Sequence, residues 1–253
     1  MFVYTPLEQF QIISLLSIKF SWLNLSFTNS ALFMLIPCVV IYLFVVLSTI
    51  KPVITTREHP ATTVWQGVVE LVYEFVLTMV LENIGEKGLK YFPFVFTTFM
   101  FILVCNLIGM VPYTFTATSH LIVTFGLAFA IWVGVTIIGF SIHKIHFFSF
   151  FFPPGAPLAL APLLVVIEII SYVFRALSLS IRLFANMMAG HTLFKIVSGF
   201  GWLMFGTAFW MAGFFPIILL FGFTGLELGV AILQAYVFTV LTCIYLNDSI
   251  HLH

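Results

Sequence analysis

The chain has 253 residues, of which 62% are hydrophobic and 7% are charged, and its mean hydropathy is +1.20. Soluble domains carry about 25% charged residues, so this chain has too few to cover a water-facing surface and is expected to be an integral membrane protein. Nine Lys and Arg balance nine Asp and Glu, and this balance argues against a nucleic-acid partner. The three cysteines lie inside apolar runs without metal-ligand spacing, so they are expected to pack, and no metal or cofactor is expected.

The first half of the chain contains three apolar stretches of the length that a bilayer requires, about 20 residues of helix. An N-terminal segment, residues 1–29, precedes the first span at residues 30–50. The second and third spans occupy residues 92–142, and the polar stretch Pro112–His120 divides them near residues 111 and 121.

Between the first two spans, residues 58–87 have a different pattern. Polar side chains recur at every fourth position, with Val, Leu, Phe and Met between them: Gln66, Glu70, Glu74, Thr78, Glu82 and Glu86. This period predicts an amphipathic helix that lies on the membrane surface or against a partner. The acidic stripe can be a solvated face or a binding surface.

The second half is dominated by a long apolar hairpin, residues 163–246. After the Pro-rich segment Phe152–Pro162, one helix is expected over residues 163–197. Gly199, Phe200 and Gly201 predict a turn, and a second helix is expected over residues 202–246. The predicted fold is therefore an all-α, single-domain membrane protein with about five transmembrane helices. Its last two helices are longer than a perpendicular span needs and are expected to be tilted.

Basic residues near the spans predict the orientation. Five of them fall on one side of the membrane if the spans alternate, and the opposite loops carry none: Lys51, Arg57, Lys87, Lys90 and Lys144. By the positive-inside rule, the N-terminus lies outside and the C-terminus inside.

Ionisable and amide side chains inside spans are costly, so each is a functional candidate. They gather in the last two helices: Glu168, Arg175, Arg182, Asn186, His191 and Lys195 in one, and Glu227, Gln234 and Asp248 in the other. Seven residues return to nearly the same helix face, so Glu168, Arg175 and Arg182 form one stripe. At 1.5 Å per residue, Glu168 and His191 are ~35 Å apart, about one hydrocarbon thickness.

An antiparallel hairpin pairs these groups at two levels. Glu168 is expected near Asp248 on the inner side, and His191 near Glu227 on the outer side, with Arg182 between them. Carboxylates and imidazole exchange protons, whereas Arg keeps its proton and attracts an anion. No carboxylate of the hairpin shares the level of Arg182, so we expect another subunit to supply one. Small or polar residues on its face would let that subunit approach closely: Ser178, Ala185, Asn186 and Ala189.

Each candidate also has a purely structural interpretation. Arg175 can pair with Glu168 or an inner lipid, and His191 or Gln234 can bond neighbouring helices. Three other protein classes are alternatives for this chain. A secondary transporter would show inverted repeats, a haem protein would need facing His ligands, and a structural anchor would tolerate the loss of Arg182.

The sequence resembles a known family at two long segments. Residues Ser178–Phe194 read SLSIRLFANMMAGHTLF, and Glu227–Asp248 read ELGVAILQAYVFTVLTCIYLND. Both closely resemble subunit a (subunit 6) of the F-type ATP synthases, as do TPLEQFQI, FTNS and NLIGMVPYTFT elsewhere in the chain.

This resemblance implies a stationary proton-channel subunit that is not catalytic alone. Arg182 would face the carboxylates of a rotating c-ring, with Asn186 and Gln234 as polar neighbours and Arg175 and Ser178 as supporting residues. His191 and Glu227 would form the outer half-channel, and Glu168 and Asp248 the inner one.

Further expectations concern the partners and the compartment. The implied partners are the c-ring, the peripheral stalk, other membrane subunits of the complex, lipids and the transported protons. The order of His191 and Glu227 departs from many bacterial members and resembles mitochondrial ones. It implies the mitochondrial inner membrane, with the N-terminus in the intermembrane space; a bacterial inner membrane is the alternative.

Overall fold

The computed structural model describes residues 6–20, 23–24, 26–49, 64–111, 114–151, 161–206 and 210–251. Within them the chain is mainly helical. The helices are α1 (Asn29–Thr49), α2 (Val64–Ile84), α3 (Phe92–Gly109), α4 (Leu121–His143), α5 (Ala161–Phe205) and α6 (Phe214–Ile250). Short 3-10 helices are η1 (Pro6–Phe10), η2 (Glu86–Tyr91), η3 (Ala117–Ser119), η4 (Lys144–Phe151) and η5 (Trp210–Gly213).

Five helical segments among the described residues are long and apolar enough to cross a membrane, as the sequence predicted. They are Asn29–Leu47, Glu86–Gly109, Leu121–Phe147, Pro162–Phe205 and Phe214–Ile250. In a bilayer core each backbone N–H and C=O needs a partner within the protein, and a helix supplies these partners. Helix α1 even accommodates Pro37 in its interior. The all-α membrane fold is therefore confirmed.

The N-terminal segment contains a feature that the sequence did not predict, four very short strands. Strand β1 (Ser14–Leu16) pairs antiparallel with β4 (Phe27–Thr28), and β2 (Lys19–Phe20) pairs with β3 (Leu23–Asn24). These pairs give the described part of the N-terminal segment a hydrogen-bonded form before α1 begins. Asn29 caps this entry, because its Oδ1 accepts hydrogen bonds from the N–H groups of Ile13 and Ser30.

Helix α2 is amphipathic in its described part. Its buried residues recur with a helical period: Val76, Met79, Val80 and Ile84. Four of the acidic stripe positions, Glu70, Glu74, Glu82 and the following Glu86, are exposed. The predicted segment 58–87 starts earlier than α2, and its residues 58–63 lie outside the described part of the chain, as do Lys51 and Arg57.

The predicted turn at Gly199–Gly201 is wrong, because α5 continues through it to Phe205. Two glycines disfavour a helix by about 1 kcal/mol each relative to Ala, but an unsatisfied backbone group in lipid costs more. Gly201 has a packing reason to lack a side chain, since a Cβ there would lie 3.3 Å from Cβ of Pro216. The helix ends at Phe205, and the N–H of the next residue, Gly206, donates to Leu203 O at 3.2 Å. Helix α6 begins at Phe214 rather than near residue 202.

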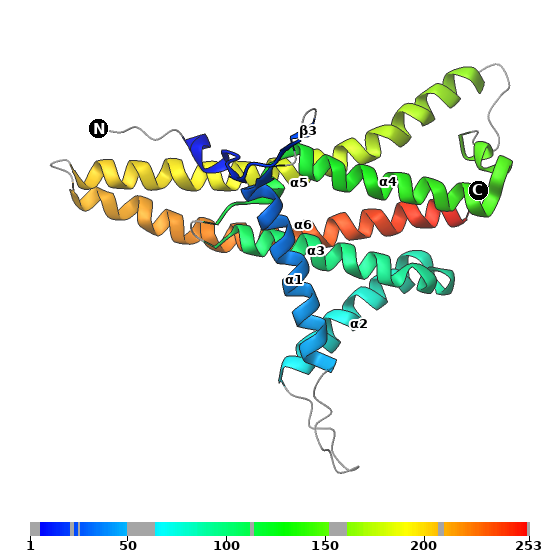
Figure 1. Ribbon diagram of the computed structural model, residues 1–253, viewed down its shortest axis with the longest axis horizontal. Coiled ribbons are helices and arrows are strands. Elements are labelled where there is room, and N and C mark those ends of the chain that lie inside the picture. Colours follow the sequence, from blue (N-terminus) through cyan, green and yellow to red (C-terminus); the bar gives the residue numbers. More distant parts are fainter. Residues whose placement is uncertain are drawn as a thin grey trace, which may run out of the picture. The chain divides into compact units, whose positions relative to one another are not determined.

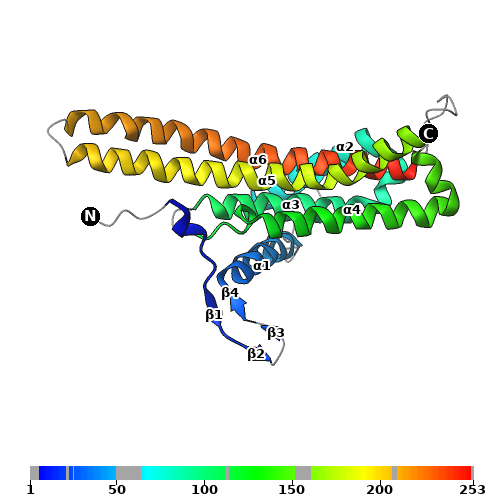
Figure 2. The same cartoon turned by 90° about the horizontal axis from the view of Figure 1, so that it is seen from above.

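The chain divides into two compact units, each assembled from distant segments. The first comprises Met1–Tyr42, Phe101–Leu121 and Leu183–Ala235, and the second Leu43–Met100, Ile122–Arg182 and Tyr236–His253. In the first unit, the yellow part of α5 and the orange part of α6 run side by side in both views (Figures 1 and 2). Ala231 and Ala235 are fully buried there, and small residues permit such close helix packing.

Polar contacts join α4 and α5 in the second unit. The indole N–H of Trp132 donates to Tyr172 O at 3.1 Å, and Thr136 Oγ1 lies 2.7 Å from Tyr172 Oη. Thr124 and Ser180 approach to 3.3 Å between their hydroxyls. These bonds satisfy polar groups that would otherwise be stranded in an apolar interior.

Candidate functional site

The first unit contains a cluster around His191 of α5 and Glu227 of α6. His191 Nε2 lies 3.9 Å from Glu227 Oε1, and the two side chains are 18% and 10% exposed. Glu227 is the more enclosed of the two, and its Oε1 is buried without a hydrogen-bond partner among the described residues. An imidazole facing a carboxylate across a short gap can exchange a proton with it.

Gly190 allows Glu227 to pack against α5. A Cβ at position 190 would lie 2.5 Å from Glu227 Oε1 and 3.0 Å from its Cδ. The carboxylate therefore rests directly on the backbone of α5, one residue before His191. A residue with any side chain at position 190 would have to displace it.

Thr116, which sequence reasoning missed, completes this cluster. It precedes η3 in the connection from α3 to α4, is 3% exposed, and its Oγ1 lies 3.1 Å from His191 Nε2. The ring of Phe10 from η1 also meets His191 edge-on at 6.4 Å between centroids. The sequence marks this segment as a divider between spans and as part of the family resemblance, but it gives Thr116 no role of its own.

A second polar group of the first unit links α5, α6 and α3. Asn186 Nδ2 donates to Gln234 Oε1 at 2.8 Å, so the predicted neighbours are in contact. Asn106 of α3, fully buried, donates to Ala231 O at 3.2 Å. Asn106 was also missed, although an amide inside an apolar span is itself a signal.

In the second unit, Arg175 joins the two carboxylates that were predicted to lie together. Its Nη1 is 3.1 Å from Asp248 Oδ2, and its Nη2 is 3.7 Å from Glu168 Oε1. The guanidinium also lies 5.5 Å from the ring centroid of Tyr245 and 5.9 Å from that of Tyr172. Arg175 is therefore neutralised within the chain, by two anions and two aromatic faces.

Arg182, one heptad further along α5, is in a different environment. Arg182 is exposed, and it forms no ion pair with any residue that the structure describes. Ser178 and Ala185, one turn to either side, are exposed as well. This part of α5 thus presents a permanent cation on a surface of small side chains.

His120 is half-buried where η3 meets α4. Its ring stacks on that of Phe115 with centroids 5.1 Å apart. Burial lowers the pKa of His120 from its ordinary value of 6.5, because an apolar environment disfavours the charged ring. At neutral pH this imidazole is uncharged.

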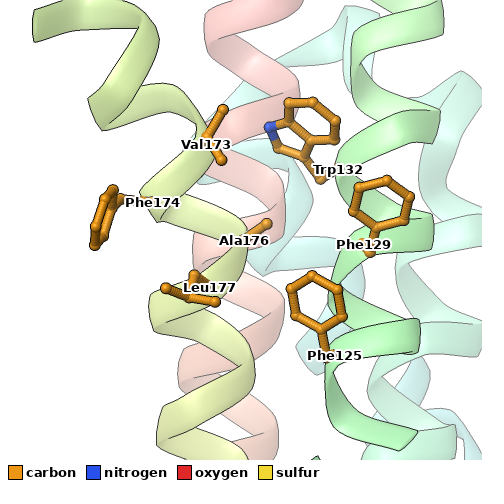
Figure 3. Close-up of a pocket in the computed structure, with 7 residues that line it drawn as sticks. All are labelled: Phe125, Phe129, Trp132, Val173, Phe174, Ala176 and Leu177. Atoms are coloured by element: carbon orange, nitrogen blue, oxygen red, sulfur yellow. The ribbon is translucent and has the colours of Figure 1, made fainter. Parts of the chain in front are cut away.

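The second unit also has a pocket with an apolar lining. A cavity of about 150 Å³ lies between α4 and α5 (Figure 3) and is lined by Phe125, Phe129, Trp132, Val173, Phe174, Ala176 and Leu177. None of these side chains titrates. The three cysteines are free, with Cys38 exposed and Cys105 and Cys243 buried.

The sequence is similar to known proteins over nearly its whole length. The family model described as ATP synthase A chain matches residues 31–247. A protein named ATP synthase subunit a from Marchantia polymorpha is 54% identical over 98% of this chain and 99% of its own length. Similarly named proteins from Brassica napus and Chondrus crispus are 52% and 48% identical, over 98% and 99% of this chain and 97% and 98% of their own lengths. The chain therefore belongs to the ATP synthase A chain family.

Proposed function

We propose that this chain is the stationary proton-translocating subunit of an F-type ATP synthase, which passes protons to and from carboxylates of a rotating c-ring. The observation that carries the proposal is the contrast between two arginines on one stripe of α5. Arg175 is paired with Asp248 and Glu168, whereas Arg182 is exposed and has no ion pair among the described residues.

An exposed arginine in a membrane span requires a partner. Placing it at the centre of a bilayer costs about 2.5–3.5 kcal/mol on insertion scales. A carboxylate at ~4 Å from the guanidinium would stabilise it by on the order of 4 kcal/mol at an effective dielectric of 20. Since small residues border Arg182, a neighbouring helix that carries a carboxylate can approach it. A ring of such helices would bring one carboxylate after another to this position.

His191 and Glu227 would form the outer entrance. A proton from the outer aqueous phase reaches His191, passes to Glu227, and then neutralises a ring carboxylate. The hydrogen-bonded amides of Asn186 and Gln234 lie one and two turns from these groups along α5 and α6, toward Arg182. They would provide a polar surface where the ring carboxylate meets this chain.

Glu168 and Asp248 would form the inner exit. Arg175 bridges the two carboxylates and holds them close together. They can then receive a proton that leaves a ring carboxylate and pass it to the inner aqueous phase. Glu168 lies ~35 Å from His191 along α5, and Asp248 lies ~32 Å from Glu227 along α6, so the proton must travel on the ring between the two sites.

Solvation limits which ring subunits can leave the interface. A protonated ring carboxyl enters lipid far more cheaply than an anion, so only neutral subunits leave the interface. Arg182 keeps the carboxylate in front of it ionised and, because it does not release its own proton, blocks a direct leak between the two sites. Each proton that crosses 100 mV supplies about 2.3 kcal/mol, so several must pass for each ATP made elsewhere in the complex.

The remaining parts of the proposal concern partners and location. The exposed acidic stripe of α2 and the lipid-facing apolar side chains leave surfaces for peripheral-stalk and other membrane subunits. We place the chain in the mitochondrial inner membrane, with its N-terminus in the intermembrane space and its C-terminus in the matrix. This orientation follows from the distribution of basic residues.

Thiol labelling from each side of the membrane tests the two entrances. In a background in which Cys38, Cys105 and Cys243 are replaced, single cysteines are introduced as Glu227→Cys and Asp248→Cys in the assembled complex. A membrane-impermeant maleimide should label position 227 only from the outer side and position 248 only from the inner side. Thr242→Cys, at a fully buried position of α6, is the control that should react from neither side. Labelling of positions 227 and 248 from one common side would refute the proposal.

A further inference from the structure

We propose that Thr116 is a positioning residue of the outer proton entrance: its hydroxyl holds Nε2 of His191 in both protonation states of the ring and so keeps that nitrogen facing Glu227. The inference rests on the proposed function of His191 and Glu227. The observation behind it is that Thr116 and Glu227 both lie near the same nitrogen of the His191 ring. The hydroxyl lies at 3.1 Å, within hydrogen-bond distance, and the carboxylate oxygen lies at 3.9 Å, beyond it.

The position of the Thr116 hydroxyl is fixed from several directions. The residue is 3% exposed, and its carbonyl accepts hydrogen bonds from the backbone N–H of Ser119 at 3.2 Å and from Ser119 Oγ at 2.6 Å. A Cβ at Gly109 would lie 2.7 Å from Thr116 Cγ2, so this side chain rests on the backbone at the end of α3. The hydroxyl therefore has a fixed position, and the imidazole keeps this hydrogen bond only if its Nε2 stays beside the hydroxyl.

The Thr116 hydroxyl has one hydrogen to donate and lone pairs that accept, and its two neighbours determine which is used where. Thr116 Oγ1 also lies 3.4 Å from Gly109 O, and a carbonyl can only accept. When the hydroxyl hydrogen points to this carbonyl, the lone pairs of Oγ1 are free to accept the N–H of His191 Nε2. This arrangement suits both the charged ring and the neutral tautomer that is protonated at Nε2.

The same hydroxyl serves the ring after proton transfer. The imidazolium gives its Nε2 proton to Oε1 of Glu227, which becomes a neutral acid, and Nε2 is left with a lone pair. The Thr116 hydroxyl then turns its hydrogen from Gly109 O to Nε2 and becomes the donor. The ring later regains a proton from outer-side water. Only a group that both donates and accepts can hold Nε2 throughout, and a hydroxyl is such a group.

Other groups around the ring do not replace this contact. Glu227 approaches from α6, and Phe10 of η1 meets the ring with an apolar edge. Lys195 follows one turn later on α5. Among the described residues, Thr116 is the one neutral hydrogen-bonding side chain that reaches Nε2.

The test compares Thr116→Val, Thr116→Ser and a matched control, Thr118→Val, in the assembled complex in membrane vesicles. Val keeps the branched shape but has no hydroxyl. Ser keeps the hydroxyl. Thr118 is also buried, and its hydroxyl has no hydrogen-bond partner among the described residues. ATP synthesis driven by an imposed proton gradient is measured as a function of outer pH, with assembly verified by the amount of the complex.

We expect T116V to slow synthesis about tenfold, which corresponds to ~1.4 kcal/mol, and to change the outer-pH profile set by His191 and Glu227. T116S should restore the wild-type rate and profile, and T118V should match the wild type. A T116V rate and profile equal to those of T118V would overturn the positioning role. Glu227→Gln, measured alongside, separates the two proposals: if E227Q blocks transport while T116V does not, only the role of Thr116 fails. If E227Q also has no effect, the proposed entrance itself fails.

Discussion

Gly190→Ala tests the contact between α5 and Glu227, because it should impair function while changing stability little. In the interior of a helix, Ala is more favourable than Gly by about 1 kcal/mol. The added methyl, however, would lie 2.5 Å from Glu227 Oε1, whereas ordinary contact begins at about 3.4 Å. The carboxylate must therefore move by about 0.9 Å from its place beside His191.

A displacement of this size is large for a proton-transfer pair. A misplacement of ~1 Å can cost on the order of 10²-fold in rate. We expect G190A to reduce both ATP synthesis and ATP-driven proton pumping by one to two orders of magnitude, while the complex assembles and melts at or near the wild-type temperature.

Gly199→Ala is the matched control on the same helix. A Cβ at position 199 would have nothing within 4 Å, so only the gain in helix propensity applies. G199A should transport protons at the wild-type rate. Wild-type proton flux in G190A, measured in vesicles that contain equal amounts of complex, would show that the position of Glu227 does not control the outer entrance.

Two further predictions concern the inner cluster and the loop before α4. Asp248→Asn leaves Arg175 with Glu168 alone, at 3.7 Å, so we expect slower ATP-driven pumping and a stability loss of about 1 kcal/mol; unchanged pumping would contradict the inner assignment. For His120, the folded-state pKa is lowered, so between that value and the unfolded value near 6.5 the unfolded state binds more protons. The contribution of His120 to stability is thus present above pH 6.5 and is lost as the pH falls below it. Thermal melts from pH 7.5 to 5.5 should decline less steeply in His120→Gln than in the wild type, and equal slopes would refute this cause.

Much of the fold was predictable because the bilayer imposes simple rules on the sequence. Apolar length set the five spans, and their observed starts at Asn29, Phe92 and Leu121 lie within one residue of the expected positions. The heptad spacing of Glu168 and Arg175 and the antiparallel order of α5 and α6 predicted which acidic and basic groups would meet. These features depend only on helix geometry and on the cost of charge in lipid.

Other features depended on contacts that local patterns do not contain. Gly199 and Gly201 were interpreted as a turn, since glycine usually weakens a helix, but packing against Pro216 gives Gly201 a place inside α5. Thr116 lies 75 residues from His191, and nothing in its own segment indicates that partner. Similarly, the sequence does not show why position 190 lacks a side chain, because the reason is the contact with Glu227 of another helix.

The central claim is that Arg182 separates two proton entrances and acts on a carboxylate of another subunit. The most direct measurement compares Arg182→Ala with Arg182→Lys in the assembled complex and records ATP synthesis, ATP-driven pumping and passive proton permeability. R182A should abolish both coupled activities while the complex still assembles, since no residue of the described chain pairs with Arg182 and stabilises the fold through it. R182K should retain at most a small part of both activities, because a lysine keeps the charge but cannot form the bidentate hydrogen bonds of a guanidinium. Full ATP synthesis and pumping in R182A would contradict the account.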